Sequence, residues 1–271
     1  MTSEKQSSLI LGVSRAAQGI VPKTLNENLE VNEQGFFNFA FSGSTSPYGQ
    51  VYYNAVSMKV DPKTKNGIFI LGVNPMNLSC RSVNDEFVDT TALREHGGFL
   101  DELWSVNSNP NFQYLFQYYN KPYYWLYLID RSPNKTGFVH DDGWLEITVP
   151  MGEEAEKRKA AKLATYIDKV KKFKLHSYRF QWLKREIQFL KKHGTVYLVR
   201  IPVDERMYRI EEDAFPEFDD LLKEVATDEE VPYFDFTHLN KSIETTDANH
   251  LFKESAYTFS EVLADSIKVN L

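Results

Sequence analysis

The chain has 271 residues, of which 42% are hydrophobic and 25% charged, a composition typical of a globular protein that buries a sizeable core. Its 38 acidic residues outnumber its 31 basic residues, and the formal net charge is −7. This balance argues against a protein that binds nucleic acid through phosphates, because such proteins usually carry a basic surplus. Cys80 is the only cysteine, so an intrachain disulfide and a cysteine-rich metal site are both excluded.

Hydropathy along the chain bears on its location. No stretch approaches the ~20 apolar residues that span a bilayer, so no membrane span is expected. The first eight residues are polar and lack the apolar core of a signal peptide. We expect a cytoplasmic protein if the chain is full length, and a cell-envelope or extracytoplasmic protein if an N-terminal signal or anchor has been removed.

Five short apolar runs predict β-strands, and helical patterns alternate with the later ones. The runs are nearly continuously hydrophobic, which is typical of strands buried on both faces of a parallel sheet. They cover residues 9–13, 36–41, 68–73, 195–201 and 232–236. Helices are predicted over residues 153–172, 177–193, 216–226 and 255–269. The alternation of strand and helix predicts an α/β domain with a parallel sheet.

The segment of residues 79–176 departs from this alternation. It is rich in Asn, Tyr, Trp and Pro, and it contains the turn signals Asn109-Pro110 and Asp142-Gly143. We interpret it as an insertion between the third and fourth strands that packs over the sheet edge, within one domain of residues 1–271.

Small or polar residues follow the first three predicted strands, at Ser14, Gly43 and Asn74. A serine at a strand-to-helix junction can expose its hydroxyl as a nucleophile and direct its own N–H at a developing oxyanion. A glycine lets a backbone N–H approach a ligand closely, and an asparagine amide can donate to an oxyanion. The alternative readings are a helix N-cap for Ser14, a plain turn at Gly43 and an Asx-turn at Asn74.

Two Asp-x-x-His sequences, Asp235/His238 and Asp247/His250, could each supply a base. A carboxylate three residues before a histidine can hold Nδ1–H and leave Nε2 as the free base. We favour Asp247 and His250, because a periodic helix follows them and would anchor their loop, whereas no sustained apolar period follows His238. The alternative for either pair is a satisfied surface contact.

Motifs of several other mechanisms are absent from the sequence. It contains no phosphate-binding G-x-x-x-x-G-K-S/T loop, no dinucleotide-binding G-x-G-x-x-G, no H-E-x-x-H zinc motif and no G-x-S-x-G nucleophile elbow. These absences leave those mechanisms without support, and the absence of a nucleophile elbow counts against the α/β-hydrolase fold.

The order Ser, Gly, Asn, His resembles the SGNH (GDSL-like) hydrolase superfamily. The matching blocks are Gly12-Val13-Ser14, Asn38-Phe-Ala-Phe-Ser-Gly43, Gly72-Val-Asn74 and Asp247-Ala-Asn-His250. The chain looks like the bacterial branch whose serine block is Gly-Ser-Ser-Arg-like, a branch largely of unassigned function. It departs from the best-known members at two positions. Val13 stands where those members have aspartate, and Pro75 stands where they often have aspartate after the asparagine.

The resemblance implies a flavodoxin-like three-layer α/β/α sandwich with a five-stranded parallel sheet. It also implies that Ser14 attacks an acyl carbonyl, that His250 accepts its proton and that Asp247 orients His250. The N–H groups of Ser14 and Gly43, with the Asn74 amide, would form the oxyanion hole. The resemblance implies neither a metal ion nor an organic cofactor.

The implied activity is that of a serine-dependent esterase, such as a carbohydrate esterase or deacetylase. The alternatives are an O-acyltransferase acting on a cell-envelope glycan and a non-catalytic member that binds glycans or serves as a scaffold. The aromatic residues of 112–125, with Trp144, are expected to form part of the wall over Ser14, or else a small core within the insertion.

Overall fold

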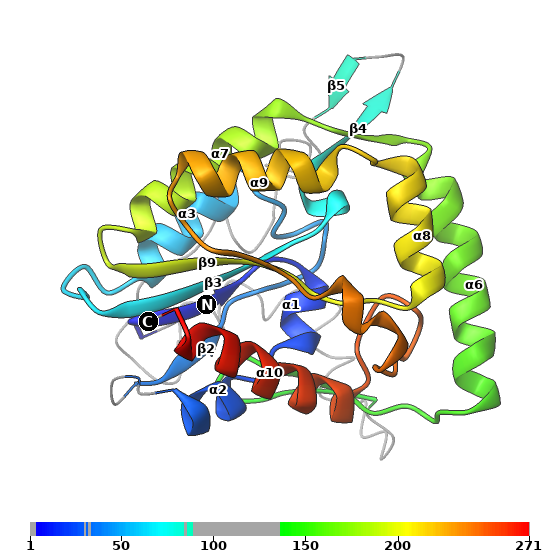
Figure 1. Cartoon of the computed structure of the whole chain (residues 1–271), viewed down its shortest axis with the longest axis horizontal. Coiled ribbons are helices and arrows are strands. Elements are labelled where there is room, and N and C mark those ends of the chain that lie inside the picture. Colours follow the sequence, from blue (N-terminus) through cyan, green and yellow to red (C-terminus); the bar gives the residue numbers. More distant parts are fainter. Residues whose placement is uncertain (1–3, 30, 32–33, 84–85, 89–135, 271) are drawn as a thin grey trace, which may run out of the picture.

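The computed structural model describes residues 4–29, 31, 34–83, 86–88 and 136–270. At its centre lies a five-stranded sheet with the strand order β2-β1-β3-β9-β10, in which all neighbouring strands are parallel (Figure 1). The strands are β1 (Ser8–Leu11), β2 (Phe36–Asn38), β3 (Gly67–Val73), β9 (Gly194–Arg200) and β10 (Tyr233–Asp235). Each lies within or beside one of the five predicted runs.

Successive residues of the central strands are buried in two different cores. In β1, Leu9 and Leu11 belong to one core, whereas Ile10 belongs to the other. In β9, Leu198 and Val199 divide in the same way. Because side chains of a strand alternate between the two faces of its sheet, strands covered on both sides must be apolar at nearly every position. This explains the continuous hydrophobicity of the five runs.

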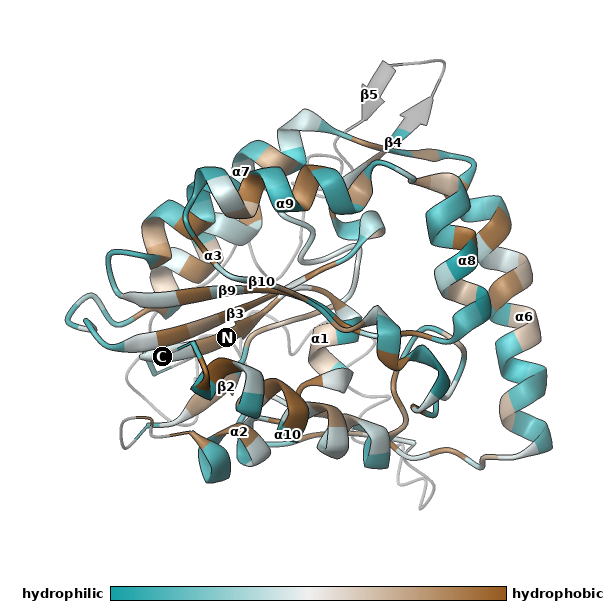
Figure 2. Ribbon diagram, in the orientation of Figure 1, coloured by the Kyte–Doolittle hydropathy of each residue, from teal (hydrophilic) through white to brown (hydrophobic). Residues whose placement is uncertain are grey.

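Helices cover both faces of the sheet and complete a three-layer α/β/α sandwich (Figure 1). One face is covered by α1 (Ser14–Gly19), α2 (Pro22–Asn28) and α10 (Lys253–Lys268), and the other by α3 (Gln50–Lys59), α7 (Ser177–Leu190) and α9 (Phe218–Asp228). Hydrophobic residues gather in the strands and on the helix faces turned toward them (Figure 2). The predicted fold class is confirmed.

Among the α-helices of the described residues, α1, α2, α3 and α8 (Glu205–Ala214) were not predicted from the sequence. The first two have six and seven residues, too few for a helical period to stand out. In α8, charged residues dominate, and one of its two buried positions is the acidic Glu211, so its apolar residues are too few for a clear helical pattern in the sequence.

The described parts of residues 79–176 lie outside the central sheet. Strands β4 (Ser79–Val83), β5 (Glu86–Val88) and β8 (Phe173–Leu175) form a small antiparallel sheet, and β6 (Gly137–Val139) pairs with β7 (Leu145–Ile147). Helix α6 (Glu153–Val170) stands beside α8 at one end of the molecule (Figure 1). No helix in the described ranges is long and apolar enough to cross a membrane.

Of the aromatic residues that were expected to form a wall over Ser14, only Trp144 lies within the described residues. Residues 112–125 lie outside the described residues. Trp144 is buried in the core on the α1 and α10 face, where its Nε1 donates to the Gln18 carbonyl at 3.0 Å and its ring meets Tyr257 edge-on. Trp144 therefore packs the domain together and does not line the cavity that contains Ser14.

Candidate active site

Ser14, Gly43, Asn74 and His250 line one cavity of about 760 Å³. The first three follow the carboxyl ends of β1, β2 and β3, and His250 precedes α10. In a parallel sheet these ends share one edge, so residues far apart in sequence meet there.

The backbone turns sharply between β1 and Ser14. Gly12 has a φ of +129°, and a Cβ atom at this position would lie 2.8 Å from the carbonyl oxygen of Gly72. Val13 occupies the N-cap position of α1, and Ser14 is the first residue of the helix. The Ser14 hydroxyl is thus not used as a helix cap, and its N–H is one of the first-turn groups that have no acceptor within a helix.

The imidazole of His250 connects Ser14 to Asp247. Its Nε2 lies 2.9 Å from Ser14 Oγ, and its Nδ1 lies 3.0 Å from each carboxyl oxygen of Asp247. Asp247 Oδ1 also accepts the backbone N–H groups of Asn249 and His250, at 3.1 and 3.0 Å. Burial by itself would raise the pKa of Asp247, but the hydrogen bond and charge of His250, together with the charge of Lys162, hold this pKa well below its usual range.

Asn249 fixes which nitrogen of His250 carries the proton. Its Oδ1 accepts hydrogen bonds from Arg15 Nε and Nη2, at 3.1 and 2.9 Å, so its Nδ2 faces His250 Nε2 at 3.0 Å. Because an amide nitrogen can only donate, Nε2 must be an acceptor there, and the proton of the neutral imidazole sits on Nδ1 beside Asp247. This is the tautomer in which Nε2 can accept a proton from Ser14.

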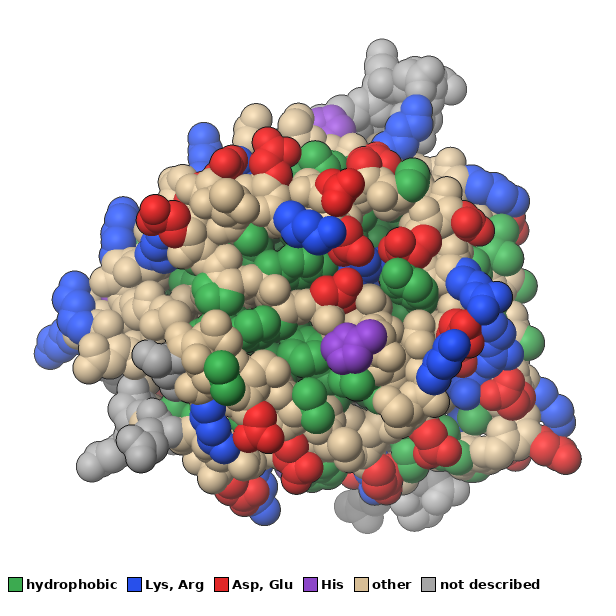
Figure 3. Space-filling model, viewed as in Figure 1, with side chains coloured by type: hydrophobic (Ala, Val, Ile, Leu, Met, Phe, Trp, Pro, Cys, Tyr) green, Lys and Arg blue, Asp and Glu red, His purple; other side chains and the backbone are tan. Residues whose placement is uncertain are grey.

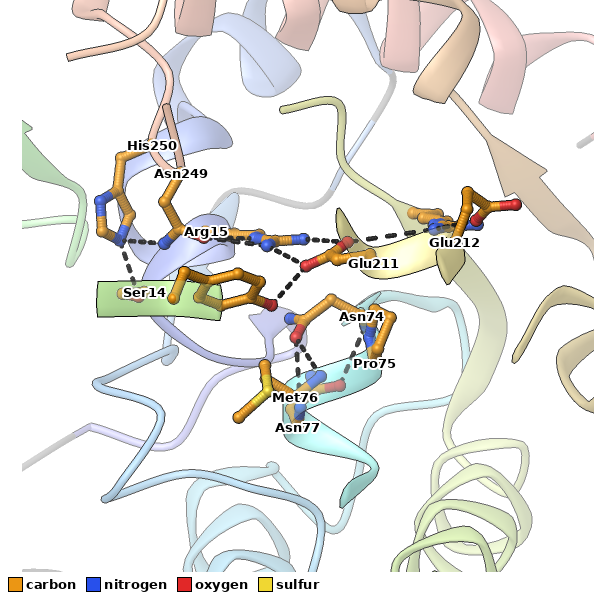
Figure 4. A network of polar contacts seen from close by, with 12 residues as sticks. Ser14, Arg15, Asn74, Pro75, Met76, Asn77, Glu211, Glu212, Asn249 and His250 are labelled. Atoms are coloured by element: carbon orange, nitrogen blue, oxygen red, sulfur yellow. Dashed lines mark hydrogen bonds and ion pairs between the residues drawn. The ribbon is translucent and has the colours of Figure 1, made fainter. Parts of the chain in front are cut away.

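A buried network of charges holds Arg15 in place (Figure 4). Arg15 donates to both carboxyl oxygens of Glu211, at 2.5 and 3.2 Å, and both side chains are at most 5% exposed. Tyr166 of α6 donates to Glu211 Oε1 at 2.6 Å, and Arg200 at the end of β9 lies 3.9 Å from Glu211 Oε2. Burial of Arg15 would lower its pKa, but the charge and hydrogen bond of Glu211 together with the interaction with Tyr166 outweigh it, so the pKa of Arg15 is raised.

Asn74 combines a structural contact with a place at the cavity. Its Oδ1 accepts the N–H groups of Met76 and Asn77, at 3.0 and 3.1 Å, and thereby caps a short 3₁₀ helix, η1 (Pro75–Asn77). Pro75 fits the first helical position because its missing N–H would have no partner there. Since Oδ1 faces the helix, the Nδ2 end of the amide remains for the cavity that Asn74 shares with Ser14. The Asn74 side chain therefore makes an Asx-type turn through its oxygen, and this turn does not use its amide nitrogen.

Gly43 lies in an exposed turn at the rim of the cavity. A Cβ atom added there would meet nothing within 4 Å, so the turn does not exclude a side chain by steric conflict. Gly43 is among the residues that line the cavity.

The second Asp-x-x-His pair lies elsewhere. The His238 Nδ1 contacts the Asp235 backbone carbonyl at 3.2 Å, and the Asp235 carboxylate accepts the Thr237 N–H instead. Neither His238 nor Asp235 lines the cavity with Ser14.

Sequence reasoning missed Arg15, Glu211, Tyr166 and Asn249. Arg15 directly follows Ser14 and Asn249 directly precedes His250, so their adjacency was a signal. Glu211 and Tyr166 had no such signal, because they reach the site only through the packing of α8 and α6.

Comparisons with known proteins give one structural likeness. No family model matches the chain, and no curated protein matches it. The structure of an inhibitor-bound aryl esterase from M. smegmatis is similar, with a TM-score of 0.39 and 11% identity over 97% of this chain and 99% of that chain. A likeness at this level assigns neither an activity nor a residue role.

Proposed function

We propose that the protein is a serine-dependent ester hydrolase with Ser14 as its nucleophile. The observation that carries the proposal is the row of hydrogen bonds from Ser14 Oγ through His250 to Asp247, at 2.9 and 3.0 Å. A nucleophile, a base within hydrogen-bond reach and a group that orients the base are the requirements of acyl transfer through a covalent intermediate.

In this mechanism Ser14 Oγ attacks the acyl carbonyl and its proton passes to His250 Nε2. The Asp247 carboxylate stabilises the resulting imidazolium, which then protonates the leaving alcohol. Water then attacks the acyl-Ser14 ester, with His250 Nε2 again accepting the proton. The bond between the acyl carbon and Ser14 Oγ breaks, the carboxylic acid leaves, and His250 returns the proton to Ser14 Oγ. The N–H groups of Ser14 and Gly43 and the Nδ2 of Asn74 stabilise the oxyanion of each tetrahedral intermediate, and each such donor contributes about 3 kcal/mol.

A fluorophosphonate probe tests the proposal on the intact chain. We expect one adduct at Ser14, located by peptide mass spectrometry, and no adduct in Ser14→Ala. His250→Ala should lose labelling and the hydrolysis of an activated acetyl ester, by about 10⁴-fold or more in kcat.

His238→Ala is the matched control, because it removes the other histidine of an Asp-x-x-His pair at a site away from the cavity. It should retain labelling and hydrolysis. An adduct on another residue, or loss of activity in His238→Ala rather than in His250→Ala, would overturn the proposal. If the acyl group is transferred to an added sugar in competition with water, the protein is an O-acyltransferase rather than a hydrolase.

A further inference from the structure

One side of the cavity is formed by a basic face of α6. Lys162, Thr165, Tyr166 and Lys169 line the cavity at spacings of three, four and seven residues, which places them on one face of the helix. Lys172 follows the helix and also lines the cavity. Arg81 of β4 lines the same cavity. We use the name basic wall for the four side chains Lys162, Lys169, Lys172 and Arg81.

The positive charges of the basic wall are poorly compensated. Lys162 lies 3.7 Å from Asp247, whereas in the described part of the chain no carboxylate pairs with Lys169, Lys172 or Arg81. Asp168 is the one acidic residue among the described residues that line the cavity, and it binds Lys171 at 3.0 Å.

Several basic residues of the same segment outside the cavity are paired with carboxylates. Lys159 contacts Glu156 at 2.9 Å, and Lys171 contacts Asp168. Lys and Arg side chains at the end of the molecule formed by α6 and α8 are interspersed with acidic ones (Figure 3). Lys157 is exposed and also has no ion pair among the described residues, but Lys169, Lys172 and Arg81 gather at the cavity that contains Ser14, in a chain whose net charge is −7.

The charges of the wall also act on one another. Desolvation lowers the pKa of Lys169, and the positive charges of Lys162 and Arg15 lower it further. An anion bound between these groups would relieve the repulsion and be held by several charges at once, because opposite charges within about 4–6 Å stabilise each other.

We propose that the basic wall binds a negatively charged group of the substrate, a carboxylate, phosphate or sulfate, so that Ser14 acts on esters of anionic molecules. The inference rests on the proposed function and names its substrate class. Val13, Met76 and Phe173 line the same cavity and provide apolar contacts for the uncharged part of the substrate.

Matched esters that differ in charge test the inference. On the acyl side, the pair is 4-nitrophenyl hydrogen suberate and 4-nitrophenyl methyl suberate; on the alcohol side, it is 4-acetoxybenzoate and its methyl ester. We expect kcat/KM for the anionic member of at least one pair to be higher by roughly tenfold at low salt. The preference should shrink as salt is raised to about 1 M, where the Debye length falls to about 3 Å.

Two variants locate the effect. Lys169→Gln combined with Lys172→Gln should lower kcat/KM for the anionic ester to about that of its neutral partner, so that the preference disappears. Lys157→Gln is the matched control, because it removes an exposed lysine of α6 that does not line the cavity and has no ion pair among the described residues. It should retain the preference.

A binding measurement separates this inference from the proposed function. Titration calorimetry of Ser14→Ala with each intact ester reports affinity without turnover, and we expect tighter binding of the anionic member. Equal binding and equal kcat/KM within both pairs would overturn the inference, while labelling of Ser14 would still uphold the hydrolase. Absence of labelling and hydrolysis would overturn the hydrolase, and the calorimetry would then decide by itself whether the wall binds anions.

Discussion

Arg15 connects the candidate nucleophile loop to the candidate base loop. Its guanidinium binds Glu211 through two oxygens and Asn249 through Nε and Nη2, so a single planar group holds the amide that faces His250 Nε2. A lysine would keep the charge, but its single ammonium group cannot reproduce this fork of donors. Arg15 is in this view a positioning residue, because it acts on His250 through Asn249.

We expect Arg15→Lys to lower kcat by about 10²-fold, because a small displacement of a base costs about that much, while KM changes little. Steady-state kinetics on an activated ester measures kcat and KM separately for each variant. Arg200→Lys is the control, because Arg200 is also buried and lies 3.9 Å from Glu211, but binds Glu212 and Asp219 rather than Asn249. If both variants lose stability and neither loses kcat, Arg15 is structural only.

At the scale of elements, the junction between β1 and α1 determines where Ser14 lies. The Gly12 N–H donates to Tyr52 Oη at 3.0 Å, and the Gly12 carbonyl accepts from Ser46 Oγ at 2.7 Å. Tyr52 in turn donates to the Phe39 carbonyl at 2.8 Å. Both polar groups of Gly12 are thus held by side chains from outside the junction, in a conformation that favours glycine.

Gly12→Ala should destabilise the protein by about 1–3 kcal/mol, because the positive φ is strained for alanine and the new Cβ would press on the Gly72 carbonyl. Urea unfolding measures the loss, and the rate of fluorophosphonate labelling should fall even where the variant is folded. Gly43→Ala is the comparison, since nothing lies within 4 Å of its added Cβ, and its stability should stay within about 0.5 kcal/mol of the original. Equal stability of the two variants would contradict this account.

At the scale of the whole molecule, a buried carboxyl group links folding to pH. Glu186 of α7 is fully buried, and neither of its carboxyl oxygens has a hydrogen-bond partner in the structure of the described residues. Desolvation raises the pKa of Glu186 from 4.5 to about 8. Between these two values the unfolded chain ionises this group while the folded protein keeps it protonated, so the free energy of unfolding falls as pH rises.

We therefore expect Glu186→Gln to raise Tm at pH 9, by about 2–4 °C for each kcal/mol gained, and to change Tm little at pH 4. The gain should develop between pH 4.5 and 8, the window between the ordinary pKa and the raised pKa. Differential scanning calorimetry of both proteins across this range measures it. A difference in Tm that is independent of pH would show that Glu186 is ionised in the folded protein.

Local sequence patterns were sufficient to predict the α/β class, the five strands and their parallel arrangement. Those strands are buried on both faces, so nearly every residue in them is apolar, and such a run can be recognised in the sequence. Leu9 and Ile10, which belong to different cores, illustrate this. The parallel arrangement also places the residues after β1, β2 and β3 at one edge, which is why Ser14, Gly43 and Asn74 could be singled out before their positions were known.

Only the tertiary structure decided which residues meet there. Both Asp-x-x-His pairs have the same spacing, and packing alone brings His250, rather than His238, within 2.9 Å of Ser14. Arg15 and Glu211 are 196 residues apart in the chain, and their contact depends on how α8 packs beside α6 and the sheet. The spacing of the α6 lysines shows that they share one face of a helix. It does not show which part of the protein that face lies against. Contacts between distant segments depend on distances in space, which local patterns do not contain.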